Sequence, residues 1–198
     1  MRFARLPLML ASILLAVSCA KPPQAEIDAA KAAVTAAAKN ADVVTYAPDS
    51  LRVAQEKIAA LDEEIGAQGR RAAISRKYET AQRLAADAAA GAARTVADAG
   101  AAKEQVAKEA AALIEKVGAS IPSFESKVWA ARRVRGIRLD FAGLGRAAVE
   151  ARAALADALK DLVAGAFAAA KAKATAVEDR LAEAEENVTA QIRVTRGR

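Results

Sequence analysis

Few residues of this 198-residue chain could carry chemistry, because it holds one cysteine and no histidine. Without histidine, the chain has no Ser-His or Cys-His pair for nucleophilic catalysis and no histidine-based metal site. Carboxylates gather at residues 62–64 and 183–186, but neither run has the loop spacing of a calcium site. These residues predict a protein that is not an enzyme, has no metal site and uses no cofactor.

One stretch, residues 124–141, combines aromatic and cationic side chains and is the best candidate for a contact site. Its tryptophan and arginines are Trp129, Arg132, Arg133, Arg135 and Arg138. Such a cluster suits anionic lipid headgroups, lipopolysaccharide phosphates or a protein partner. The alternative is a linker helix whose tryptophan packs on the end of a bundle while its arginines stay in water.

The N-terminus predicts an export signal. Arg2 and Arg5 precede an apolar run at residues 6–17. The run is shorter than the roughly 20 residues that a membrane-spanning helix needs, and it fits a secretory signal peptide over residues 1–18. The chain's only cysteine, Cys19, follows directly, so no disulfide can form within the chain.

This arrangement resembles the lipobox of bacterial lipoproteins. In that family the cysteine is acylated and the signal peptide is cleaved just before it, which implies a lipidated tether at residues 19–23. Two or more acyl chains hold a protein stably on a membrane, whereas a single chain binds reversibly. Ala20 stands where many inner-membrane lipoproteins carry aspartate, which implies the outer membrane, facing the periplasm. The alternative is an unmodified thiol in a secreted protein.

The composition predicts an all-α protein. Alanine dominates the sequence, and aromatic residues make up only 4% of it. Alanine has the highest helix propensity, and with Glu, Lys, Leu and Arg it is typical of long helices and coiled coils. Because alanine buries little apolar area, such helices need length, close packing or a homo-oligomer to be stable. The net charge of +6, with both signs interspersed, does not indicate a nucleic-acid partner.

Apolar residues recur at spacings of three and four, the period of a helix that packs through one face. The first seam consists of Leu51, Ala54, Ile58, Leu61 and Ile65. The second consists of Ile74, Tyr78, Ala81, Ala85, Ala88 and Ala92. The third, toward the C-terminus, includes Val149, Leu155, Leu159, Leu162, Ala166, Val177, Leu181, Ala184 and Val188. The seams predict long helices at about 24–65, 71–117 and 146–193.

Proline and glycine are expected to interrupt these helices. Pro48 predicts a kink in the first helix, and Gly66–Gly69 predicts the turn that follows it. A second turn is predicted at Gly118–Pro122, and a further break near Gly136 or Gly143.

The expected organisation is a helical domain at 24–118, a basic-aromatic linker helix at 119–145, and a long helix at 146–198 that packs on the same bundle. Helices of matched length joined by short turns favour antiparallel neighbours. We therefore predict an elongated, antiparallel, coiled-coil-like bundle of long alanine-rich helices. The alternative is a helical hairpin with a loose N-terminal helix.

Two stretches together resemble an uncharacterised helical domain of bacterial envelope lipoproteins. They are Tyr46-Ala47-Pro48-x-x-Leu51-x-x-Ala54-x-x-Lys57-Ile58 and Tyr78-x-x-Ala81-x-x-Leu84-Ala85-x-x-Ala88. The resemblance covers roughly residues 20–100 and implies an envelope location and a helical fold. In some members of this family the domain precedes an OmpA-like peptidoglycan-binding domain, whereas more predicted helix follows here.

These observations predict a non-enzymatic envelope lipoprotein that serves as a periplasmic helical spacer, scaffold or partner-binding module. Its expected partners are the membrane, through the N-terminal lipid, and an envelope protein or peptidoglycan. The alternative function is a binding module for peptidoglycan or lipopolysaccharide through the Arg132–Arg138 region.

Overall fold

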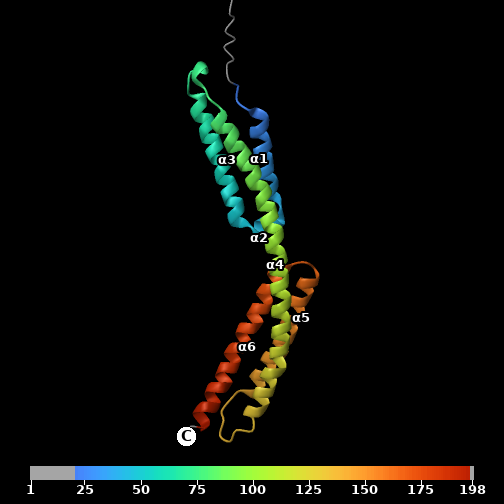
Figure 1. The fold of residues 1–198 in the computed structure, drawn as a ribbon. Coiled ribbons are helices and arrows are strands. Elements are labelled where there is room, and N and C mark those ends of the chain that lie inside the picture. The colour runs from blue at the N-terminus through green and yellow to red at the C-terminus, as the bar shows by residue number, and fades with distance from the viewer. Residues whose placement is uncertain (1–20, 197–198) are drawn as a thin grey trace, which may run out of the picture. The chain divides into compact units, whose positions relative to one another are not determined.

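A computed structural model describes residues 21–196, and it confirms the all-α prediction (Figure 1). The α-helices in this part of the chain are α1 (Gln24–Lys39), α2 (Ala41–Tyr46), α3 (Pro48–Gly69), α4 (Glu79–Ala131), α5 (Phe141–Val163) and α6 (Phe167–Arg196). A short 3₁₀ helix, η1 (Ala73–Ser75), precedes α4. None of the described helices is both long enough and apolar enough to cross a bilayer. The predicted export signal and Cys19 lie outside the described residues.

The chain divides into two compact units, which we call unit 1 and unit 2. Among the described residues, unit 1 consists of residues 21–36 and 52–93, and unit 2 of residues 37–51 and 94–196. Unit 1 therefore contains most of α1 and α3 with the beginning of α4. Unit 2 contains α2, the remainder of α4, and both α5 and α6.

In unit 1, the helices α1 and α3 both pack on the beginning of α4. The buried residues of this core are Ile27, Ala30, Leu61, Tyr78, Ala81, Ala85 and Ala88. An ion pair of 2.6 Å between Lys31 and Asp62 joins α1 to α3 at the surface. Alanine is frequent in this core because its small side chain lets helix backbones approach closely.

The first predicted helix is instead a helical hairpin in which α1 and α3 lie side by side (Figure 1). Asn40 interrupts it, because its side chain accepts a hydrogen bond from the backbone N–H of Asp42 at 2.9 Å and so caps α2. A second break falls at Ala47, directly before Pro48, where the helical conformation is disfavoured. The prediction of one kinked helix over residues 24–65 is therefore wrong.

The first two predicted seams are largely confirmed within unit 1. Ala54 and Leu61 are buried in α3, which continues through the turn predicted at Gly66 and ends at Gly69. In the second seam, every residue from Tyr78 to Ala92 is buried. Its first member, Ile74, is instead 83% exposed because it lies in η1, before α4 begins.

In unit 2, α4, α5 and α6 surround a larger core. Its buried residues are Val117, Ile121, Phe124, Val128, Ala131, Ala148, Ala151, Val177, Leu181 and Val188. Ion pairs of 2.5 Å cross from α4 to α6 at Lys127–Glu185 and at Glu109–Lys171. Their side chains are partly exposed, so they contribute less to stability than the apolar core does.

The short helix α2 belongs to unit 2. Val43 and Ala47 are buried against Ala99 of α4. Beside them, Lys103 forms an ion pair of 2.9 Å with Asp42. The hydrogen bond to this carboxylate raises the pKa of Lys103 above its ordinary value. Both apolar and ionic contacts therefore hold α2 against α4.

The turn predicted at Gly118–Pro122 is not there, because α4 runs through Pro122 without a break. Ile121 and Phe124, on either side of the proline, are both buried in the core of unit 2. Burial of these side chains offsets the backbone hydrogen bond that a proline cannot donate. Residues 119–131 are consequently the last turns of α4, and not a separate linker helix.

The predicted long C-terminal helix is also wrong, because residues 164–166 separate α5 from α6. Gly165 has a φ of 79°, a left-handed conformation that glycine adopts at little cost. The third seam is correct for Val177, Leu181 and Val188, which are buried. Val149 and Leu159, expected in the same seam, are 64% and 49% exposed.

Replacing Pro122 with alanine is expected to stabilise unit 2. Pro122 is exposed in the interior of α4, where proline is disfavoured by about 3 kcal/mol relative to alanine. Because the helix is already formed around it, we expect a gain of about 1–3 kcal/mol in the free energy of unfolding. Urea titration followed by the fluorescence of Trp129, the only tryptophan, measures this change. As a control, Ser123→Ala on the same exposed turn is expected to change it far less. An unchanged or lower stability of Pro122→Ala would contradict the prediction.

Candidate functional site

The basic stretch predicted from the sequence lies in and beside the loop that joins α4 to α5. The helix α4 ends at Ala131, and the predicted break occurs at Gly136, which has a φ of 82°. Asp140 then caps α5, since its side chain accepts a hydrogen bond from the backbone N–H of Gly143 at 2.9 Å. The loop between these residues presents its arginines to solvent.

Aromatic rings hold two of the predicted arginines in place. The guanidinium of Arg133 lies over the ring of Trp129, 3.4 Å from its centroid. Arg132 lies over the ring of Phe141, 5.2 Å from its centroid. These are cation–π contacts, which orient the cation without neutralising it. Trp129 is 57% exposed, so its indole lies mostly at the surface and not inside the bundle.

The remaining predicted residues, Arg135 and Arg138, are exposed in the same loop. Within residues 21–196, no ion pair or hydrogen bond joins Arg133, Arg135 or Arg138 to a carboxylate. Arg146, one turn into α5, is 3.7 Å from Asp140. The structure thus brings the predicted residues together and leaves most of their charge uncompensated.

The fold adds arginines that sequence reasoning missed. A Cβ built on Gly136 would lie 3.9 Å from the methyl group of Thr195, so the end of α6 lies against the α4–α5 loop. The last turn of α6 carries Arg193 and Arg196. We call the resulting surface the Arg-rich end of unit 2; its arginines are Arg132, Arg133, Arg135, Arg138, Arg146, Arg193 and Arg196.

An open groove of about 300 Å³ lies between the end of α4 and the beginning of α5. It is lined by Phe124, Glu125, Val128, Trp129, Arg132, Leu144, Gly145 and Ala148. Arg152 donates a bidentate pair of hydrogen bonds to the carboxylate of Glu125, at 2.5 and 2.6 Å. The hydrogen bond from Arg152 holds the pKa of Glu125 below its ordinary value, so this carboxylate stays ionised at neutral pH. The groove is therefore apolar inside and charged at its rim.

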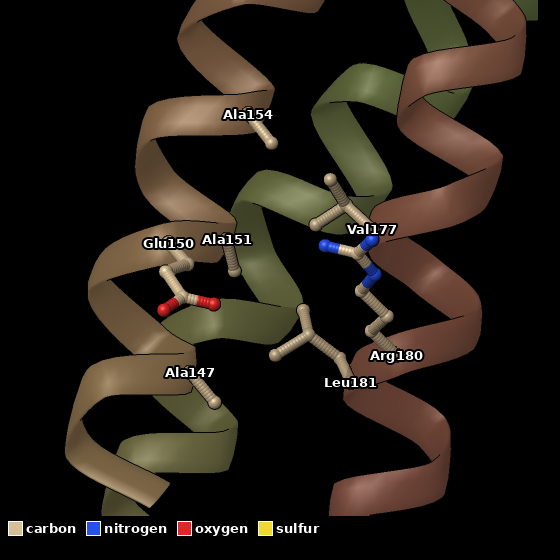
Figure 2. Close-up of a pocket in the computed structure, with 7 residues that line it drawn as sticks. All are labelled: Ala147, Glu150, Ala151, Ala154, Val177, Arg180 and Leu181. Carbon is tan, nitrogen blue, oxygen red and sulfur yellow. The ribbon is translucent and has the colours of Figure 1, made fainter. Parts of the chain in front are cut away.

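A smaller cavity of about 50 Å³ lies between α5 and α6 (Figure 2). Three alanines of α5, with Val177 and Leu181 of α6, leave it unfilled. Figure 2 shows the side chains of Glu150 and Arg180 on opposite sides of it. Ligand sites usually measure several hundred Å³, and this cavity has room for a few water molecules at most. It is a packing gap left by small side chains.

The groups gathered at the Arg-rich end are chemically suited to binding anions. Across residues 21–196, no three acidic, histidine or cysteine side chains converge to hold a metal ion. The Arg-rich end offers guanidinium groups, which make bidentate hydrogen bonds to phosphates and carboxylates, beside an exposed indole. This combination suits an anionic surface or polymer.

Compared with known proteins, the chain matches no family model, no curated protein and no solved structure. The resemblances to the lipobox and to the helical domain of envelope lipoproteins therefore stay predictions.

Proposed function

We propose that the chain is a non-enzymatic lipoprotein of the bacterial envelope, anchored to the membrane through an acylated Cys19. It faces the periplasm and serves there as a helical spacer, scaffold or partner-binding module. The observation that carries the proposal is the N-terminal sequence, in which a short apolar run behind two arginines ends at the chain's only cysteine. An outer-membrane location follows from Ala20 at the position after the cysteine.

The described residues support a role in binding or spacing. Helix accounts for most of residues 24–196, and most of the charged side chains lie on its exposed faces. Before α1, residues 21–23 have no regular structure, as suits a short link to a lipid. The groove at the Arg-rich end is open, and the cavity between α5 and α6 is too small for a substrate.

Replacing Cys19 with serine is expected to abolish attachment to the membrane. Serine lacks the thiol that receives the lipid, so the variant loses its anchor. We expect wild-type cells fed radioactive palmitate to show a labelled band that floats with membranes, and the variant to be unlabelled and absent from that fraction. Ser18→Ala, which keeps the thiol, serves as the matched control. A wild-type chain without label, or a Cys19→Ser variant that still floats with membranes, would contradict the proposal.

A second candidate function is binding of peptidoglycan or lipopolysaccharide, and the Arg-rich end is the observation that favours it. Its exposed arginines and indole are concentrated on one surface of unit 2. Anionic polymers of the envelope carry carboxylates and phosphates at high density, and arginine binds both.

Removing four of these arginines is expected to abolish co-sedimentation with anionic polymer. The variant R132A/R133A/R135A/R138A tests this with the chain from Ala20 to Arg198 and purified sacculi, or with lipopolysaccharide aggregates. A control of equal charge change, R83A/R94A/K108A/R180A, alters exposed cations of α4 and α6 outside the Arg-rich end and is expected to pellet like the wild type. Equal pelleting of both variants, or none by the wild type, would rule out this second function.

A further inference from the structure

The loop between α3 and α4 in unit 1 exposes an apolar side chain among cations. Ile74 is 83% exposed at its tip, in η1. Residues 70–78 contain Arg70, Arg71, Arg76 and Lys77 and no acidic residue. An isoleucine held in water is unfavourable, and a surrounding set of cations is typical of surfaces that meet an anionic lipid headgroup layer.

Hydrogen bonds within the loop hold Ile74 in this position. Arg76 donates to the carbonyl oxygens of Gly69 and Arg71, each at 3.1 Å. The side-chain oxygen of Gln68, a residue only 4% exposed, accepts the backbone N–H of Lys77 at 3.0 Å. Arg76 therefore shapes the loop, while Arg70, Arg71 and Lys77 have exposed side chains. The loop presents these groups without further folding.

Within unit 1, this loop lies at the same end as the beginning of the described chain (Figure 1). Ile27, in the first turn of α1, is buried in the same core as Tyr78, the residue that follows the loop. Cys19 precedes Pro23 by four residues. Four residues of extended chain span at most about 14 Å, so a lipid on Cys19 would be held close to this end of unit 1.

We propose that the α3–α4 loop docks on the anionic phospholipid surface of the membrane that holds the lipid of Cys19. Ile74 enters the headgroup layer, and Arg70, Arg71 and Lys77 contact lipid phosphates. The placement at the membrane rests on the proposed function, whereas the affinity of the loop for anionic lipid is a property of unit 1 alone. A lipid tether by itself leaves a protein free to rotate, and docking of the loop fixes how unit 1 faces the membrane.

A label at residue 74 tests the docking directly. The chain from Ala20 to Arg198 contains no cysteine, so Ile74→Cys gives a single thiol for an environment-sensitive nitrobenzoxadiazole label. We expect its emission to shift to the blue and rise with vesicles of phosphatidylglycerol and phosphatidylethanolamine, and not with phosphatidylcholine vesicles. Val163→Cys is the matched control, since Val163 is also 83% exposed but lies at the end of α5, outside any cationic cluster. No change at residue 74, or an equal change at residue 163, would overturn the proposal.

The contribution of the cations is tested with the same label. In R70A/R71A/K77A, we expect the vesicle concentration needed for half of the change at residue 74 to rise at least about tenfold. The charge-matched variant R94A/K108A/R180A, altered at exposed positions outside both the loop and the Arg-rich end, is expected to leave that value within about twofold of the parent's. Equal effects of the two variants would overturn the proposal. The chain used with vesicles lacks Cys19, so this assay does not depend on the lipid anchor. If residue 74 does not respond to vesicles while the full-length protein is labelled with palmitate, the docking proposal is refuted and the proposed function is not.

Discussion

Replacing Phe124 with alanine is expected to lower the free energy of unfolding of unit 2 by about 3–5 kcal/mol. Phe124 is fully buried and is the largest fully buried side chain in the described chain. Its neighbours in the core are mainly valine, leucine and alanine, which cannot extend into the space that the ring would leave. The loss therefore combines the missing burial with the cost of a cavity.

Urea titration followed by Trp129 fluorescence measures this loss. Trp129 lies five residues after Phe124 on α4 and is the chain's only tryptophan, so its signal reports unit 2. Val149→Ala is the control, because Val149 belongs to the same unit but is 64% exposed. A loss below about 1 kcal/mol for Phe124→Ala, or one equal to that of the control, would show that this core is not packed as described.

Replacing Leu61 with alanine is expected to destabilise unit 1 by about 2–5 kcal/mol. Leu61 is fully buried, and most other buried residues around it are alanines of α1 and α4. Because alanine contributes little apolar area, unit 1 depends strongly on its few large side chains. Hydrogen exchange of the backbone amides of α3 measures the change, since unit 1 contains no tryptophan.

The control for Leu61 is Ile74→Ala in the same unit. The exposed position of Ile74 predicts a change of a few tenths of a kcal/mol at most, although both residues were assigned to helix seams from the sequence. Comparable losses for the two variants would contradict the described position of the α3–α4 loop.

The sequence predicted the helical class and much of unit 1 because these features depend on local periodicity. Leu61 and the alanines from Ala81 to Ala92 recur at helical spacing, and they are buried. Ile74 lies four residues before Tyr78 and so fits the same spacing, but it lies outside α4. The hydrogen bonds of Arg76 to carbonyl oxygens of the loop favour a non-helical backbone there, and periodicity carries no information about them.

The turns were predicted less well, and at Pro122 burial overrides a local preference. Pro122 indicated a turn, yet Ile121 and Phe124 beside it are buried, and α4 continues. In contrast, Asn40 and Gly165 do end helical segments. Both carry signals that were present in the sequence, a side chain suited to an N-cap and a residue suited to a left-handed conformation.

The sequence likewise predicted only part of the candidate site. The arginines of the α4–α5 loop are close in sequence, so their clustering was predictable. Arg193 and Arg196 join them only because the end of α6 lies against Gly136, a contact between residues some sixty positions apart. A tertiary contact of this kind follows from the packing of three helices, which the periodicity of any one of them does not specify.

Mass spectrometry of the full-length protein purified from bacterial membranes shows whether Cys19 carries the lipid anchor. We expect the N-terminal peptide to begin at Cys19 and to carry covalently attached acyl chains. A chain that begins elsewhere, or a Cys19 with an unmodified thiol, would contradict it.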